Sequence, residues 1–114
     1  MLLYLVMTRE KTIFSPLLVS WKEWRQKIFE RDNYTCQECG NRGCYIEPHY
    51  IYAVDSMLKS LEDLYGKVTD KLLGRHELLF STKNGITLCR SCHMKTMRKE
   101  KQFESQYALA VNTR

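Results

Sequence analysis

The sequence predicts a small α+β domain that is closed by a zinc ion on four cysteines. Two Cys-x-x-Cys pairs, at 36–39 and 89–92, offer the four thiolates that a tetrahedral structural zinc requires. Apolar residues recur at helical spacing before the first pair and again between the pairs, while a short run at 45–47 has the character of a strand. With 114 residues and no internal repeat, the chain has the length of one domain.

The first helix is expected from about residue 21 to Asp32. Ser20 and Glu23 have the spacing of a capping box. In such a box the Ser20 hydroxyl accepts a hydrogen bond from the Glu23 N–H, and the Glu23 carboxylate accepts one from the Ser20 N–H. An apolar stripe then follows at helical spacing, opposite a basic face; its members are Trp21, Trp24, Ile28 and Phe29. We assign the two tryptophans to the core rather than to base stacking.

The segment between the cysteine pairs changes from strand to helix. A strand at 45–47 enters Pro48-His49, and apolar residues at steps of three and four predict a helix at 54–65 that Gly66 stops. A shorter apolar pattern ends at Gly74. The runs 78–80 and 86–88 bracket a turn centred on Asn84-Gly85, and a polar, basic helix is expected from Arg90 to about Tyr107.

The chain is expected to form a single domain at residues 19–108, with a helical insertion at about 54–75. An N-terminal extension at 1–18 and a C-terminal tail at 109–114 flank it. The spacer between the cysteine pairs, residues 40 to 88, is longer than an ordinary zinc-finger loop. Because closure entropy grows only logarithmically with loop length, zinc can close a whole subdomain here.

The cysteines are predicted to bind metal rather than to form disulfides. The apolar start, Met1 to Met7, is too short to span a bilayer and lacks the flanks of a signal peptide, so no membrane partner is expected. A cytoplasmic chain with reduced thiols is the simplest interpretation. Cys44, the fifth and odd cysteine, is interpreted as a bystander in a loop.

Basic residues flank the cysteine pairs. The net charge of +5 and the pI near 9.0 are compatible with a polyanionic partner, although many basic proteins bind no nucleic acid. One run lies around and after the second pair and consists of Arg90, Lys95, Arg98, Lys99 and Lys101; another, at 22–31, precedes the first. A solvated helix face explains either run alone. Together they favour a surface that contacts phosphates, with double-stranded DNA as the expected partner.

The residues around the two cysteine pairs resemble the zinc-stapled HNH endonucleases common in phages and bacteria. The matching stretches are Trp24-Arg25, Arg31 through Gly40, Ile46 through His49, and Asn84 through His93, with 55–80 matching only as an insertion. The resemblance implies a ββα-metal (His-Me finger) fold around a divalent cation. It also implies metal-dependent hydrolysis of phosphodiester bonds in DNA, in the cytoplasm of a bacterial or phage-infected cell.

Roles carry over from this resemblance residue by residue. His49 matches the first position of the family's His-His pair, a ligand of the catalytic cation, and His93 matches the helical residue that binds the same ion. Asn84 matches the residue that braces the loop by hydrogen bonds. The residues that match the separate structural zinc are Cys36, Cys39, Cys89 and Cys92. The catalytic cation would be Mg²⁺, Mn²⁺ or Ni²⁺, which offsets charge on the phosphate and the leaving oxygen.

Two positions depart from the family pattern. The general base should stand at position 50, where this chain has Tyr50, and a phenol with a pKa near 10 is a poor base at neutral pH. Met97, four residues after His93, stands where many relatives have another histidine. A thioether is a poor ligand for a hard cation such as Mg²⁺.

These departures leave three alternatives. His49 acts as the base itself while His93, a carboxylate and phosphate oxygens hold the ion; Glu47, on the same face of the strand as His49, is the candidate carboxylate. Alternatively, Tyr50 or His76 supplies the missing function. In the third, the site is impaired and leaves a zinc-stabilised module that binds nucleic acid. A zinc-ribbon interaction domain would leave the Asn84 and His93 matches unexplained.

Overall fold

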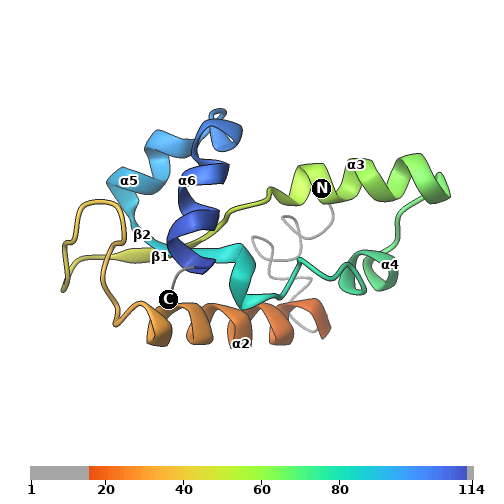
Figure 1. Ribbon diagram of the computed structural model, residues 1–114. Coiled ribbons are helices and arrows are strands. Elements are labelled where there is room, and N and C mark those ends of the chain that lie inside the picture. The colour runs from red at the N-terminus through yellow and green to blue at the C-terminus, as the bar shows by residue number, and fades with distance from the viewer. Residues whose placement is uncertain (1–15, 113–114) are drawn as a thin grey trace.

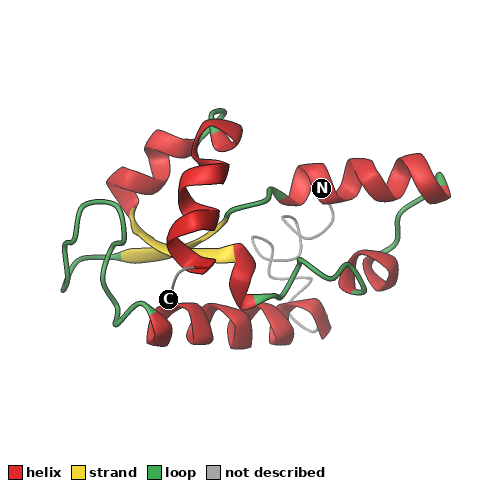
Figure 2. Cartoon of the chain, in the orientation of Figure 1, coloured by secondary structure: helices red, strands yellow, loops and turns green. Residues whose placement is uncertain are grey.

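The computed structural model describes residues 16–112 and shows a small α+β fold in which helices surround a two-stranded sheet (Figures 1 and 2). The elements are α2 (Pro16–Arg31), β1 (Ile46–Tyr50), α3 (Val54–Tyr65), α4 (Asp70–Gly74), a 3₁₀ turn (Thr82–Asn84), β2 (Gly85–Cys89), α5 (Arg90–Thr96) and α6 (Glu100–Asn112). The predicted α+β class is thereby confirmed. Most of the predicted N-terminal extension, residues 1–15, lies outside the described residues. Within 16–112, no helix is long and apolar enough to cross a membrane.

The sheet has two faces with different coverings. β1 and β2 pair antiparallel, with His49 opposite Ile86 and Tyr50 opposite Gly85. Because successive side chains of a strand point to opposite faces, His49 and Tyr50 lie on different sides of the sheet. In Figure 1, α2 runs below the sheet, α5 lies above it, and α6 runs down in front of it. Tyr50 stacks on Trp24 of α2, whereas His49 faces α5 and α6.

α2 begins one turn earlier than predicted, and the predicted capping box is wrong. The helix starts at Pro16, so Ser20 lies inside it. Proline is common at the first helical position because its missing N–H has no partner there. The added turn buries Leu17 and Leu18 against a cluster shared with α3 and α4, a tertiary contact that outweighs the local cap. The predicted stripe is buried at Trp24, Ile28 and Phe29.

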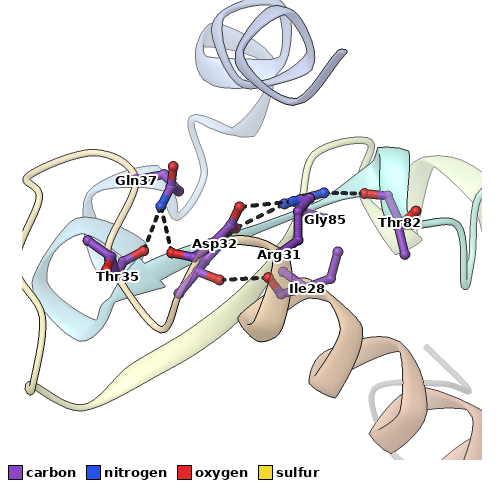
Figure 3. A network of polar contacts seen from close by, with 8 residues as sticks. Ile28, Arg31, Asp32, Thr35, Gln37, Thr82 and Gly85 are labelled. Atoms are coloured by element: carbon purple, nitrogen blue, oxygen red, sulfur yellow. Dashed lines mark hydrogen bonds and ion pairs between the residues drawn. The ribbon is translucent and has the colours of Figure 1, made fainter. Parts of the chain in front are cut away.

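A buried ion pair fastens the end of α2 to β2 (Figure 3). The Asp32 carboxylate accepts hydrogen bonds from Arg31 Nε and Nη2 and from the Thr87 N–H, each at 2.9 Å. The same guanidinium donates to the carbonyls of Thr82 and Gly85. Burial opposes ionisation of Asp32, but the bonds from Arg31 and Thr87 hold its pKa below the usual value. The pair therefore fixes where the first cysteine loop leaves the helix.

The predicted helical insertion forms α3 and α4, which extend beyond the sheet on one side (Figure 1). Met57, Leu58 and Leu61 of α3 are buried with Leu73 of α4. Gly66 ends α3 as predicted, with a φ of +79° that glycine adopts at no steric cost. The insertion thus adds its own apolar cluster to the domain.

The single helix predicted from Arg90 to about Tyr107 is wrong, because the chain breaks between α5 and α6. Arg98 at the break has a φ of 64°, and its N–H donates to Glu100 Oε1 at 3.2 Å. No glycine or proline marks this position in the sequence. The break turns α6 back onto the sheet, where Tyr107 and Val111 are buried. α6 continues to Asn112, so most of the predicted C-terminal tail is helical.

Candidate functional site

The four predicted zinc ligands converge at one end of the sheet. The sulfurs of Cys36, Cys39, Cys89 and Cys92 lie within 4.8 Å of one another, and Cys39 Sγ is 3.8 Å from Cys89 Sγ. Zinc–sulfur bonds of about 2.3 Å in a tetrahedron place sulfurs roughly 3.8 Å apart. The four cysteines are therefore positioned to bind zinc. Cys44 is exposed and stands outside the cluster, in agreement with the bystander interpretation.

Local structure explains how each pair reaches the cluster. After α2, Asn33 and Tyr34 both adopt positive φ of 55° and reverse the chain into the first cysteine loop. In that loop the Cys39 N–H points to Cys36 Sγ at 3.5 Å, so one tight turn presents both sulfurs. Of the second pair, Cys89 ends β2 and Cys92 lies in the first turn of α5.

The charge balance of the cluster favours a bound cation. Burial alone would raise the pKa of Cys36, but backbone N–H groups of Cys39, Cys89 and Glu38 lower it to about 7. Burial and the neighbouring cysteine side chains raise the pKa of Cys92. The negative charge of one thiolate therefore opposes deprotonation of the next cysteine. A divalent cation between the sulfurs offsets this repulsion between like charges.

His49 of β1 and His93 of α5 face each other on the α5–α6 side of the sheet. Their ring centroids are 5.2 Å apart, with an interplanar angle of 74°. Two imidazoles that share one ion at about 2.1 Å place their centroids roughly 5 Å apart, so the spacing fits a shared cation. His49 is only 4% exposed, and its Nε2 has no hydrogen-bond partner within residues 16–112. A buried polar atom without a partner is what a ligand would satisfy.

The environment of His49 suits a metal ligand better than a general base. Burial, with a smaller contribution from the charge of His93, lowers the pKa of His49 to about 3. The imidazole is therefore neutral at pH 7, as a metal ligand must be. A base with so low a proton affinity is a poor one at that pH. The alternative in which His49 itself activates water is thus disfavoured.

Glu47 lies against His93 rather than standing free beside His49. Its Oε1 is 2.9 Å from His93 Nδ1, and its Oε2 is 3.6 Å from Arg90 Nη1. Glu47 and His49 are two residues apart on β1 and therefore share a face of the strand. The candidate carboxylate is in the site, but its two oxygens already face α5.

Tyr50 and His76 are not brought to the histidine pair. Tyr50 stacks on Trp24 with centroids 4.3 Å apart, and burial raises its pKa well above the ordinary value of 10. His76 follows α4, where its ring stacks against Tyr52 and its Nδ1 accepts from the Leu78 N–H at 3.1 Å. Neither side chain is placed to supply the missing base.

Asn84 braces the loop by hydrogen bonds, as the resemblance implies. Its Oδ1 accepts from the Tyr52 N–H at 2.7 Å, and its Nδ2 donates to the carbonyls of Tyr52 and Leu78. Its own carbonyl accepts from the Ile51 N–H. These bonds tie the segment that follows β1 to the turn that precedes β2, which holds His49 in register with the strand leading to α5.

The chain matches no protein-family model, no curated protein and no solved structure. The resemblance to HNH endonucleases therefore rests on the motifs and on the geometry described above. The four-cysteine cluster is independent of it, since it follows from the positions of the sulfurs.

The five residues of the predicted basic run after the second cysteine pair are all solvent-exposed. They are on α5, on the break after it and on the first turn of α6: Arg90, Lys95, Arg98, Lys99 and Lys101. Lys101 also lines a groove between α3 and α6, whose other charged lining residues are Lys59, Asp63 and Glu104. Met97 is exposed and stays a departure from the family pattern.

Sequence reasoning missed the contribution of α6 to the site. Tyr107 places its ring against His49, with centroids 5.7 Å apart, and stacks on Phe103. The signal was present, because Phe103, Tyr107 and Val111 recur at four-residue steps and form a short apolar stripe. Only the break at Arg98 turns that stripe toward the histidines.

Proposed function

We propose that this chain is a zinc-stapled HNH-type endonuclease that hydrolyses phosphodiester bonds in double-stranded DNA with the help of a bound divalent cation. The observation that carries the proposal is the pairing of His49 and His93 across β1 and α5. It is supported by the Asn84 brace and by the order of these residues along the chain. Two strands followed by a helix support the ββα-metal fold that the resemblance implies.

Each part of the site has a chemical task in this proposal. His49 and His93 would hold Mg²⁺, Mn²⁺ or Ni²⁺, which offsets charge on the scissile phosphate and the leaving oxygen. The basic residues of α5 and α6 would grip flanking phosphates, so that binding weakens as salt rises. The structural zinc would keep the β2–α5 junction in place, since Cys89 and Cys92 bracket it.

A second candidate function is favoured by the placement of Tyr50. The phenol is buried against Trp24, and His49 is covered by Tyr107 with its pKa lowered by burial, so neither residue of the 49–50 pair is placed as a general base. The alternative is a catalytically impaired HNH-like module that binds nucleic acid and is ordered by zinc. Binding alone does not discriminate the two functions, because both predict it.

The discriminating experiment is nicking of supercoiled plasmid by zinc-loaded protein with added Mg²⁺, Mn²⁺ or Ni²⁺. His93→Ala removes an imidazole from the pair, and His76→Ala is the matched control outside it. We expect cation-dependent nicking that His93→Ala abolishes and His76→Ala retains. Salt-sensitive DNA binding without nicking under any cation would establish the binding module instead. Equal nicking by wild type and His93→Ala would refute catalysis at this site.

A further inference from the structure

We propose that Glu47 is a positioning residue that orients His93 toward the cation, and that it is not itself a ligand of the cation. The inference rests on the proposed function for the identity of the ion. The contact on which it stands is a feature of the fold: Glu47 Oε1 lies 2.9 Å from His93 Nδ1, and side-chain exposures of 23% and 32% place both groups in partial shelter from water.

The chemistry of the contact determines which ring nitrogen is left for a metal. An ionised carboxylate only accepts hydrogen bonds, so a neutral imidazole bonded to it carries its hydrogen on Nδ1. The lone pair is then on Nε2. Carboxylates that hold the second nitrogen of a metal-binding histidine fix both its orientation and its tautomer in this way. His49 contributes a matching atom, its buried Nε2 without a hydrogen-bond partner among the described residues.

The geometry of the two elements makes Glu47 a brace between them. On β1, Glu47 and His49 share a face, so the strand presents one ligand and the support for the other. On α5, Arg90 and His93 are three residues apart and lie on one side of the helix. Glu47 contacts both, one with each oxygen, and so restrains rotation of α5 against β1.

The two contacts of Glu47 differ in weight. The Arg90 side chain is 66% exposed and its nitrogen is 3.6 Å from the carboxylate, so that ion pair is screened by water and contributes little. The contact with His93 is shorter and more sheltered. The contact with His93 is therefore the one that determines the role of Glu47, and it is the contact on which the proposal rests.

The first test reads the tautomer of His93 by ¹⁵N NMR in zinc-loaded protein without added cation, at mildly alkaline pH, where histidines are ordinarily neutral. Wild type and the control Glu62→Ala, an exposed acid on α3, are expected to carry the hydrogen on Nδ1. Glu47→Ala should move it to Nε2, while Glu47→Gln, whose amide oxygen still accepts, retains the wild-type form. A His93 tautomer that does not respond to Glu47→Ala would overturn the proposal.

The second test is Mn²⁺ affinity, measured by electron paramagnetic resonance on the same proteins; Mn²⁺ competes poorly for the thiolate site. Glu47→Ala is expected to weaken Mn²⁺ binding about 10- to 100-fold, as for other residues that support a metal ligand. Glu47→Gln should weaken it less, and Arg90→Ala by less than about threefold. Equal losses for Glu47→Ala and Glu47→Gln would indicate a direct ligand and overturn the proposal, as would a wild type that binds no Mn²⁺.

The two proposals fail separately. If the tautomer and Mn²⁺ results are as expected but plasmid is not nicked, Glu47 is the positioning residue of a cation site and the endonuclease proposal is refuted. If plasmid is nicked while Glu47→Ala leaves both the tautomer and the Mn²⁺ affinity unchanged, the endonuclease stands and the role of Glu47 is refuted. Circular dichroism of each variant shows whether it is folded.

Discussion

Tyr50 occupies the position where the resemblance requires a base, yet its ring is part of the core. We expect Tyr50→His not to raise nicking, because an imidazole there would face Trp24 on the opposite side of the sheet from His93. It should lower the free energy of unfolding by about 1–3 kcal/mol, the cost of a buried polar group without a partner. Tyr50→Phe removes a buried hydroxyl without a partner and should be neutral or slightly stabilising.

Urea unfolding and the plasmid assay on both Tyr50 variants check this prediction. Tyr50→Phe is the matched control because it keeps the stacked ring. A gain in nicking of about tenfold for Tyr50→His would show that position 50 reaches the reacting atoms and would contradict the placement.

His49 predicts a measurable pH dependence of stability. Its pKa of about 3 in the fold lies below the ordinary 6.5, so between these values the unfolded chain takes up a proton that the folded chain refuses. Stability therefore falls as pH decreases from 6.5 toward 3 and is unaffected by this group above 6.5. Between pH 6.5 and 5 the loss is about 2 kcal/mol, at about 1.4 kcal/mol per pH unit.

The measurement is urea unfolding of wild type and His49→Gln at pH 7 and pH 5. Protonation of the zinc thiolates affects both proteins, so it cancels in the difference. Wild type should lose about 2 kcal/mol more than the variant on going to pH 5. A difference between the two proteins that does not change with pH would show that His49 is not held neutral by burial.

At the level of elements, boundaries with local signals were predictable, and boundaries set by packing were not. For example, α3 ends at Gly66, the glycine at which the sequence predicts its end. The start of α2 and the break at Arg98 depend instead on which apolar faces meet in the folded chain. Gly85 was predicted as a turn residue, but it is extended in β2. A Cβ there would lie 2.5 Å from the Trp24 ring, so the close approach of α2 requires glycine.

The junction of α2 and β2 depends on Asp32, whose side chain is fully buried in its pair with Arg31. Asp32→Asn keeps the shape but removes the charge that Arg31 and the Thr87 N–H recognise. We expect the free energy of unfolding at pH 7 to fall by about 3 kcal/mol, since breaking one side of a buried pair leaves the other uncompensated. Glu30→Gln, an exposed acid two residues earlier, is the control. A loss below about 1 kcal/mol in urea unfolding would show that water reaches the pair.

For the whole molecule, residues that bear chemistry were easier to predict than the parts that shape their surroundings. The cysteine cluster and the facing histidines follow from motifs with fixed spacing. The contact of Tyr107 with His49 and the contact of Glu47 with His93 depend on how α5 and α6 are oriented against the sheet. No local sequence pattern encodes that orientation. Long-range packing therefore determines whether the predicted ligands are exposed to solvent and which side chains support them.

Zinc is predicted to be a condition for the fold, because the cysteines belong to one of its two apolar clusters. Cys36, Cys89 and Cys92 are buried with Ile86, Leu88 and Tyr107, whereas the cluster of α2, α3 and α4 contains no cysteine. Structural zinc contributes about 10–16 kcal/mol in small domains, as much as or more than the roughly 5–15 kcal/mol of their net stability. Chelation at pH 7 should therefore unfold the sheet, α5 and α6, with amide protection in α3 lost last.

Hydrogen exchange before and after chelation measures this order, and metal analysis should give about one zinc per chain. Cys92→Ser should behave like the chelated protein, because it removes a buried ligand. Cys44→Ser, an exposed cysteine outside the cluster, should leave both the zinc content and the protection unchanged. Retention of protected amides in β2 and α6 after complete zinc removal would mean that the apolar contacts of Ile86, Leu88 and Tyr107 suffice. In that case apolar packing alone would hold the histidine pair in place, and zinc would not be required for the fold around it.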